Sequence, residues 1–385
     1  MSDELFQTLK DFPTPLDESQ CVFYNKHELL ICGGYEQKAC YSYNILKNEY
    51  KFICDYPSDL YLVGHCVVKV VDNNNNNNNK DDNEIILLSF GGSKFRKRHT
   101  LIMKYVSVWS NISNKLNKLN NFNQWIPFTD HHNHPIIIGR DENHNYHGAR
   151  AVISGSNNHL LFITYQLKNI SIFDLNTFQF IKHCDLPTNE VISYHCFISK
   201  LENGQKQEMI KKNKQTYQMI LFSRYTGLSI EYNENNNTFQ FHQLSVYNDI
   251  ALLRYYAYVY INDLILFFGG WNGQFDDIII SKSIYKYLIE ENKWMTFQST
   301  LPNPLCDCIA ILNEEDNFIH IIGGRDDKNI TLSTHMKTKV RVLDPSQLSK
   351  NEMKFINQYW IRILDLKLGW IDDFYNIIFK YIKMK

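Results

Sequence analysis

An all-β fold built from six repeated units is predicted by two spacings that recur along the chain. The first is a hydrophobic run that ends in a glycine doublet, as in residues 29–34 (LLICGG). The same run returns at 86–92, 264–270 and 318–324, and two copies without the doublet occupy 160–165 and 219–224. Repetition over such intervals indicates an array of similar supersecondary units.

The second spacing is a pair of aromatic residues seven positions apart, with turn-forming residues between them. The pairs are Tyr43 and Tyr50, Phe173 and Phe180, Tyr232 and Phe239, and Tyr287 and Trp294. A constant interval across a turn places the two rings on one face of a hairpin, where they pack as neighbours. Together with the two-residue alternation of apolar and polar positions, this spacing predicts units of four short antiparallel strands.

A single four-stranded sheet cannot bury both of its faces, so the six sheets are expected to stack around an axis as a β-propeller. The units resemble Kelch repeats, in which a hydrophobic strand ends in Gly-Gly and two separated aromatic residues follow. The doublets step by 54 residues from Gly270 to Gly324, close to the Kelch period of about 50 residues. The resemblance covers residues 4–344, although only one unit keeps a Trp in its last strand.

The two ends of the chain predict how the ring closes. The sixth unit lacks a fourth strand, and residues 5–9 (LFQTL) supply one, since Phe6 and Pro13 repeat the interval between Tyr50 and Pro57. We therefore expect an N-terminal strand to complete the last blade and remove its free edge. Residues 347–385 change to a helical apolar period, which predicts a C-terminal helical extension that packs on the propeller or docks on another protein.

Composition restricts the classes of partner. The 385 residues carry 40 basic and 41 acidic side chains, so no bulk charge attracts nucleic acid or an anionic membrane. The first residues lack a basic and apolar leader, and no apolar run reaches the roughly 18 residues that span a bilayer. Nine scattered cysteines are typical of reduced thiols. We expect a soluble cytoplasmic protein that acts as a monomer.

Several residue clusters suggest chemistry, and each has a simpler explanation. Residues 130–134 (DHHNH), with His144 and His147, are metal-ligand types without the convergent spacing of a zinc site, so a solvated loop is expected. Cys306 and Cys308 sit where a unit opens, as do Cys21, Cys66 and Cys196, and small apolar packing near the axis explains them. The basic run 94–99 and the asparagine tract 73–79 are expected to be polar loops. No metal or cofactor is predicted.

The loops that follow the doublets share one face of a propeller with the segments that join successive blades. Tyr, Trp and Arg dominate the binding energy of protein interfaces because they combine area with directed polar contacts. The candidate partner-binding residues on this face are Tyr35, Arg96, Arg224, Tyr225, Arg254, Trp271 and Arg325.

The leading functional hypothesis is a non-enzymatic scaffold that binds a protein or peptide on this face, as the Kelch resemblance implies. One alternative is a propeller enzyme that acts on a sugar-like molecule in the central pocket, which His65, His195 and Arg254 could approach. Another is an actin-binding cytoskeletal protein, for which co-sedimentation with actin filaments is the discriminating measurement.

Overall fold

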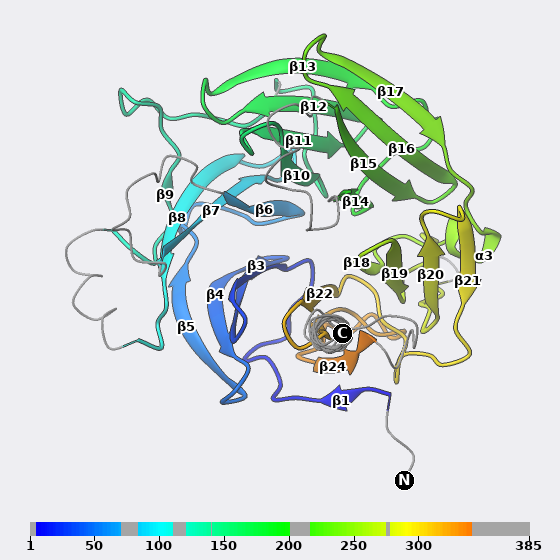
Figure 1. Cartoon of the computed structure of the whole chain (residues 1–385). Helices are drawn as coiled ribbons and strands as arrows, with labels where there is room; N and C mark the ends of the chain where they lie inside the picture. Colours follow the sequence, from blue (N-terminus) through cyan, green and yellow to red (C-terminus); the bar gives the residue numbers. More distant parts are fainter. Residues whose placement is uncertain are drawn as a thin grey trace, which may run out of the picture.

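Six four-stranded antiparallel sheets surround a central axis in the computed structural model (Figure 1). The structure describes residues 5–70, 84–110, 121–139, 141–200, 216–274 and 278–340. The protein is a six-bladed β-propeller, as the repeat pattern predicts, and the described residues add one short helix, α3 (Asn248–Ala251). The expected helical extension at 347–385 and the asparagine tract lie outside the described residues. In the described part of the chain, no helix is long and apolar enough to cross a membrane.

We number the blades 1 to 6 along the chain. In blades 1 to 5 the four strands run outward from the axis in chain order, and in blade 6 the outermost strand is the first strand of the chain (Figure 1). The innermost strands are β2 (Gln20–Asn25), β6 (His65–Val70), β10 (Arg150–Ser154), β14 (Cys196–Ser199), β18 (Ala257–Ile261) and β22 (Ile309–Asn313). The second strands are β3 (Glu28–Gly34), β7 (Glu84–Gly91), β11 (Leu160–Tyr165), β15 (Thr216–Ser223), β19 (Leu264–Phe268) and β23 (Phe318–Ile322). The third strands are β4 (Gln37–Asn44), β8 (His99–Val106), β12 (Asn169–Asp174), β16 (Thr226–Asn233), β20 (Ile284–Leu288) and β24 (His335–Lys339). The outermost strands are β5 (Glu49–Asp55), β9 (Ile126–Pro127), β13 (Gln179–Asp185), β17 (Thr238–Gln243), β21 (Lys293–Thr296) and β1 (Gln7–Thr8).

The seven-residue aromatic spacing is explained by the hairpin between the third and fourth strands. Tyr43 faces Tyr50 across β4 and β5, with ring centroids 4.8 Å apart. The other three pairs also face each other, at 5.2 Å (Phe173 and Phe180), 5.1 Å (Tyr232 and Phe239) and 5.0 Å (Tyr287 and Trp294). The predicted hairpins are therefore confirmed.

The second strand of a blade is apolar throughout because both of its faces are buried. In β3, Leu29 and Ile31 pack toward blade 6, whereas Leu30 and Cys32 pack toward blade 2. The described residues form six hydrophobic clusters of this kind. Each cluster fills the seam, the interface between two neighbouring blades, at a different place in the ring. Burial of these seams is what holds the six sheets in a ring.

The glycine doublets lie where one blade touches the next. Gly269 and Gly323 adopt left-handed φ angles of 65° and 63°. A Cβ atom at Gly269 would lie 2.0 Å from the Leu305 carbonyl oxygen, and one at Gly323 would lie 2.1 Å from that of Leu16. Only glycine satisfies both the backbone conformation and the close approach.

The N-terminal strand closes the ring, as the spacing at the two ends predicts. In β1, Gln7 pairs with Lys337 of β24 and Thr8 pairs with Met336. The Phe12 amide then donates to the Ser333 carbonyl at 2.7 Å, and its buried ring packs edge-on against Tyr50 of blade 1. The first residues of the chain therefore join the last blade to the first.

Candidate functional site

One face of the propeller carries most of the exposed apolar side chains. It comprises the connections between second and third strands and the segments that join successive blades, and we call it the loop face. Among the described residues, fifteen large hydrophobic side chains are exposed, and eleven of these lie in loop-face connections. They are Tyr35, Phe95, Ile137, Leu167, Val191, Tyr225, Tyr247, Leu252, Ile278, Ile279 and Ile330.

The most exposed of these side chains lies in the β7–β8 connection. Phe95 is 81% exposed there and is flanked by Lys94 and Arg96. The Lys94 ammonium lies 5.1 Å from the centroid of the Phe95 ring, and the Arg96 guanidinium lies over Tyr61 at 4.5 Å. No carboxylate of the described residues forms an ion pair with either cation.

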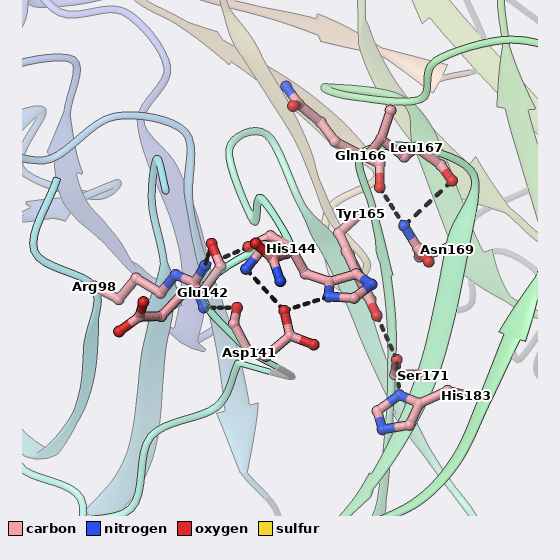
Figure 2. A network of polar contacts seen from close by, with 11 residues as sticks. Arg98, Asp141, Glu142, His144, Tyr165, Gln166, Leu167, Asn169, Ser171 and His183 are labelled. Atoms are coloured by element: carbon pink, nitrogen blue, oxygen red, sulfur yellow. Dashed lines mark hydrogen bonds and ion pairs between the residues drawn. The ribbon is translucent and has the colours of Figure 1, made fainter. Parts of the chain in front are cut away.

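The rest of this basic run is used within the fold. Lys97 forms an ion pair with Asp59. Arg98 donates to the backbone carbonyls of Asp141 at 2.5 Å and Glu142 at 3.2 Å, and also to that of His144 (Figure 2). The Arg98 side chain therefore anchors the segment that joins blade 2 to blade 3.

The histidine-rich stretch forms a structured turn in the same segment. Asp130 Oδ1 accepts 2.8 Å hydrogen bonds from the backbone amides of both His132 and His134. His144 Nδ1 pairs with Asp141 Oδ1 at 2.7 Å (Figure 2), and His147 Nε2 lies 2.8 Å from the Tyr194 hydroxyl. No group of three His, Cys, Asp or Glu side chains in the described ranges is arranged to hold a metal ion.

The seven residues expected on the loop face do not all present free side chains. Tyr35 and Tyr225 are exposed at 42% and 56%. Arg224 lies 3.5 Å from Glu190 and packs against Tyr225. Arg254 and Trp271 are joined by two backbone hydrogen bonds of 2.7 and 2.8 Å, which fix the blade 5 connections to each other.

Arg325 is directed toward the axis, where two buried acids hold it. Its Nη2 atom donates to Asp307 Oδ2 at 2.5 Å, and its Nε atom lies 3.2 Å from Asp17 Oδ2. The two acids raise the pKa of Arg325 against the opposing effect of burial. This guanidinium is therefore held by the fold and is not a free side chain of the loop face.

A ring of six left-handed residues surrounds the central axis, one just before each innermost strand. They are Glu18, Gly64, Gly148, Tyr194, Tyr255 and Asp307, with φ angles between 51° and 68°. We call this set the axial ring. Four of its members are not glycine, which is uncommon for this conformation and marks strain that the surroundings must hold.

Hydrogen bonds link neighbouring members of the axial ring. Four of the six steps around the ring are backbone hydrogen bonds. Written with the amide donor first and the carbonyl acceptor second, they are Glu18 to Asp307 (3.0 Å), Asp307 to Tyr255 (2.9 Å), Tyr194 to Gly148 (2.8 Å) and Gly148 to Gly64 (2.9 Å). At the fifth step, the Gly64 amide donates to the Glu18 carboxylate at 3.0 Å. At the sixth, the Tyr194 and Tyr255 rings pack with centroids 4.5 Å apart.

Two carboxyls of the axial ring hold their protons more tightly than usual. Burial, and then the charge of Asp307, raises the pKa of Glu18 to about 7. Burial raises the pKa of Asp307 to about 6, although Arg325 opposes this shift. Carboxyls with such pKa values in a cleft are typical of functional sites and also occur in structural networks.

A cavity of about 190 Å³ lies on the axis, bounded by the four members of the axial ring that are not glycine and by five of the six innermost strands. Glu18, Asp307, Arg150, Tyr194 and Tyr255 line it.

His65, His195 and Arg254, the residues considered for a central pocket from the sequence, do not line this cavity. His65 Nε2 lies 3.0 Å from the Cys32 carbonyl, and His195 Nε2 lies 2.6 Å from Thr164 Oγ1. Of the residues that do line it, Cys66 and Cys308 were expected near the axis. The polar residues Glu18, Arg150, Tyr194 and Asp307 were missed, although Gly64 and Gly148 mark the left-handed position just before an innermost strand.

The comparisons with known proteins support the fold and do not extend to a family. No family model matches the chain, and no curated protein matches it. Among solved structures, the chain is similar to one described as "Structure of YjhT", with 12% sequence identity and a TM-score of 0.56. The match covers 87% of this chain and 98% of that one, which supports the propeller architecture over the described ring. The Kelch resemblance stays a prediction.

Proposed function

We propose that the protein is a non-enzymatic, monomeric cytoplasmic scaffold that binds a protein or peptide segment on the loop face. The observation that carries this proposal is the concentration of eleven of fifteen exposed large hydrophobic side chains on that face, counted over the described residues. Exposed apolar side chains gathered in one region mark interaction surfaces more often than side chains scattered singly.

The partner segment is proposed to be apolar and acidic. Apolar side chains of the partner would cover residues such as Phe95 and Tyr225, which the fold leaves in water. Acidic side chains would meet Lys94 and Arg96, for which the described residues provide no carboxylate. Aromatic and arginine side chains are enriched among the residues that dominate protein interfaces. Because the seams between blades hold the loops in place, little entropy is lost when a partner binds.

The experiment compares two double variants that each remove two exposed apolar side chains. The loop-face variant carries Phe95→Ser and Tyr225→Ser. The control carries Leu46→Ser, in the β4–β5 turn, and Met295→Ser, in the outer strand β21. Partners are captured from native cells, identified by mass spectrometry and titrated against each purified protein. We expect the loop-face variant to lose affinity at least tenfold and the control to match the natural protein; equal affinity for both variants would contradict the proposal.

A further inference from the structure

The axial cavity contains a positive charge that the fold leaves without a counter-charge. Arg150 is half-buried at the start of β10 and lines the cavity. Its guanidinium donates to the Ala149 carbonyl at 3.1 Å and lies over the Tyr194 ring at 5.5 Å. No carboxylate of the described residues pairs with it, whereas Arg224 and Arg325 both have acidic partners. A cation held in a cavity is normally paired, because removing it from water is costly.

A carboxylate oxygen without a donor lies on the other side of the axis. Asp307 belongs to blade 6, which is opposite the blade 3 position of Arg150 in the six-bladed ring (Figure 1). The Asp307 side chain is 1% exposed, and its Oδ2 atom accepts from Arg325. Its Oδ1 atom is buried and has no hydrogen-bond partner. Buried polar atoms are almost always satisfied, so this carboxylate has unused capacity to accept a hydrogen bond, and Asp307 is one of the residues that line the cavity.

The acidic side of the cavity favours a cationic donor over a neutral one. Arg325 pairs with Asp17 and Asp307, and no cation of the described residues pairs with Glu18, so this side has an excess of negative charge when the acids are ionised. Tyr194 and Tyr255 also line the cavity.

We propose that the axial cavity binds a small free amino acid, with its carboxylate on Arg150 and its ammonium toward Asp307 and Glu18. The two ends of such a zwitterion match the Arg150 cation, which has no counter-charge, and the carboxylates of Glu18 and Asp307, all of which line the cavity. The volume agrees, because an engineered cavity of about 150 Å³ holds benzene, and this cavity measures about 190 Å³. The inference concerns binding alone and does not depend on the loop-face partner.

The test titrates the purified full-length protein with the twenty proteinogenic L-amino acids, one at a time, and follows melting temperature and then heat of binding. At least one of the smaller amino acids is expected to bind, while tryptophan is too large and is not. For the amino acid that binds, its α-hydroxy acid and its decarboxylated amine are each expected to bind at least tenfold more weakly. Absence of binding by all twenty, or equal binding of the hydroxy acid, overturns the proposal.

Two variants of cavity residues test whether the amino acid binds in the axial cavity. Arg150→Gln is expected to weaken binding at least tenfold, whereas Lys293→Gln, which alters an exposed cation on the outer strand β21, leaves it unchanged. Glu18→Gln preserves an acceptor for the Tyr194 hydroxyl while removing negative charge, and is expected to weaken binding severalfold. Circular dichroism confirms folding of each variant. Unchanged affinity in a folded Arg150→Gln, or in Glu18→Gln should the former not fold, overturns the assignment.

Discussion

The Tyr194 hydroxyl donates a 2.6 Å hydrogen bond to Glu18 Oε2, although the two residues are 176 positions apart in the chain. The same oxygen accepts from the Gly64 amide at 3.0 Å. One carboxylate therefore ties together the entrances of blades 1, 2 and 4. The axial ring is a joint property of several blades, and its members are expected to affect the stability of the whole propeller.

Closure by the N-terminal segment predicts that Phe12→Ala destabilises the propeller. The Phe12 ring is buried and packs edge-on against Tyr41 and Tyr50 at 5.1 and 5.2 Å. Truncating a buried Phe costs about 3–5 kcal/mol. Chemical denaturation measures the loss, and Phe95→Ala is the matched control because its ring is exposed. If Phe12→Ala unfolds at the same denaturant concentration as Phe95→Ala, the closure of the ring does not contribute as described.

Close packing of the axial ring predicts that Gly148→Ala is strongly destabilising. A Cβ atom at Gly148 would lie 2.5 Å from the Tyr194 ring and 2.9 Å from its amide, at a φ of 68°. We expect a loss on the order of 3 kcal/mol from overpacking and backbone strain. Gly139→Ala is the control, because Gly139 is outside the left-handed region and its nearest neighbour is a side-chain nitrogen of Arg98 at 3.1 Å, so a change within about 1 kcal/mol is expected. Similar melting temperatures for the two variants would argue against a tightly packed ring.

The ion-pair network predicts that Arg325→Ala destabilises the fold instead of only weakening partner binding. Its removal leaves Asp307, which is fully buried, without its cation. Removing one partner of a buried pair costs on the order of 3 kcal/mol. Thermal unfolding at pH 7 measures the loss, and Arg96→Ala should be nearly neutral because its guanidinium has no carboxylate partner in the described part of the chain. A neutral Arg325→Ala would mean that the Asp307 carboxylate does not depend on this pair.

The raised pKa of Glu18 predicts a pH dependence with a definite sign. Its pKa rises from an ordinary value of 4.5 to about 7, so the folded protein holds a proton that the unfolded chain releases between these pH values. The stability due to this proton is fully present below pH 4.5 and is lost as the pH rises through 7.

Glu18→Gln isolates that contribution, because the buried histidines affect both proteins alike. The free energy of unfolding of the natural protein, minus that of Glu18→Gln, should fall by on the order of 1–3 kcal/mol from pH 4.5 to pH 7. Denaturation curves at half-unit pH steps provide the comparison. A difference that stays constant or rises over this range would show that the Glu18 pKa is not raised.

The sequence predicts the blades well because local spacing determines them. The interval from Tyr43 to Tyr50 reflects the hairpin that joins them, and the doublet at Gly323 reflects contact with the next blade. The link between the two chain ends was also predictable, since Phe6 and Pro13 repeat an interval found in other units.

The axial ring and the cavity that it borders were not predictable from the same spacings. The members of the axial ring come from different blades. They share a left-handed backbone conformation, which the sequence signals only at the two glycines, Gly64 and Gly148. Register explains a second error. Cys66 and Cys196 occupy equivalent positions, opposite Phe90 and Phe222, whereas Cys21 lies opposite Ile31, one residue further along its strand. A shift of one residue turns a side chain to the other face of a strand.

Hydrogen–deuterium exchange of the protein, alone and bound to its captured partner, tests most directly the claim that the loop face is the interface. We predict slower exchange in loop-face connections at residues 93–98 and 224–227, with no change in the turns at 45–48 and 290–293 on the opposite face. Protection confined to those opposite turns, with the loop face exchanging as in the free protein, would contradict the proposed function.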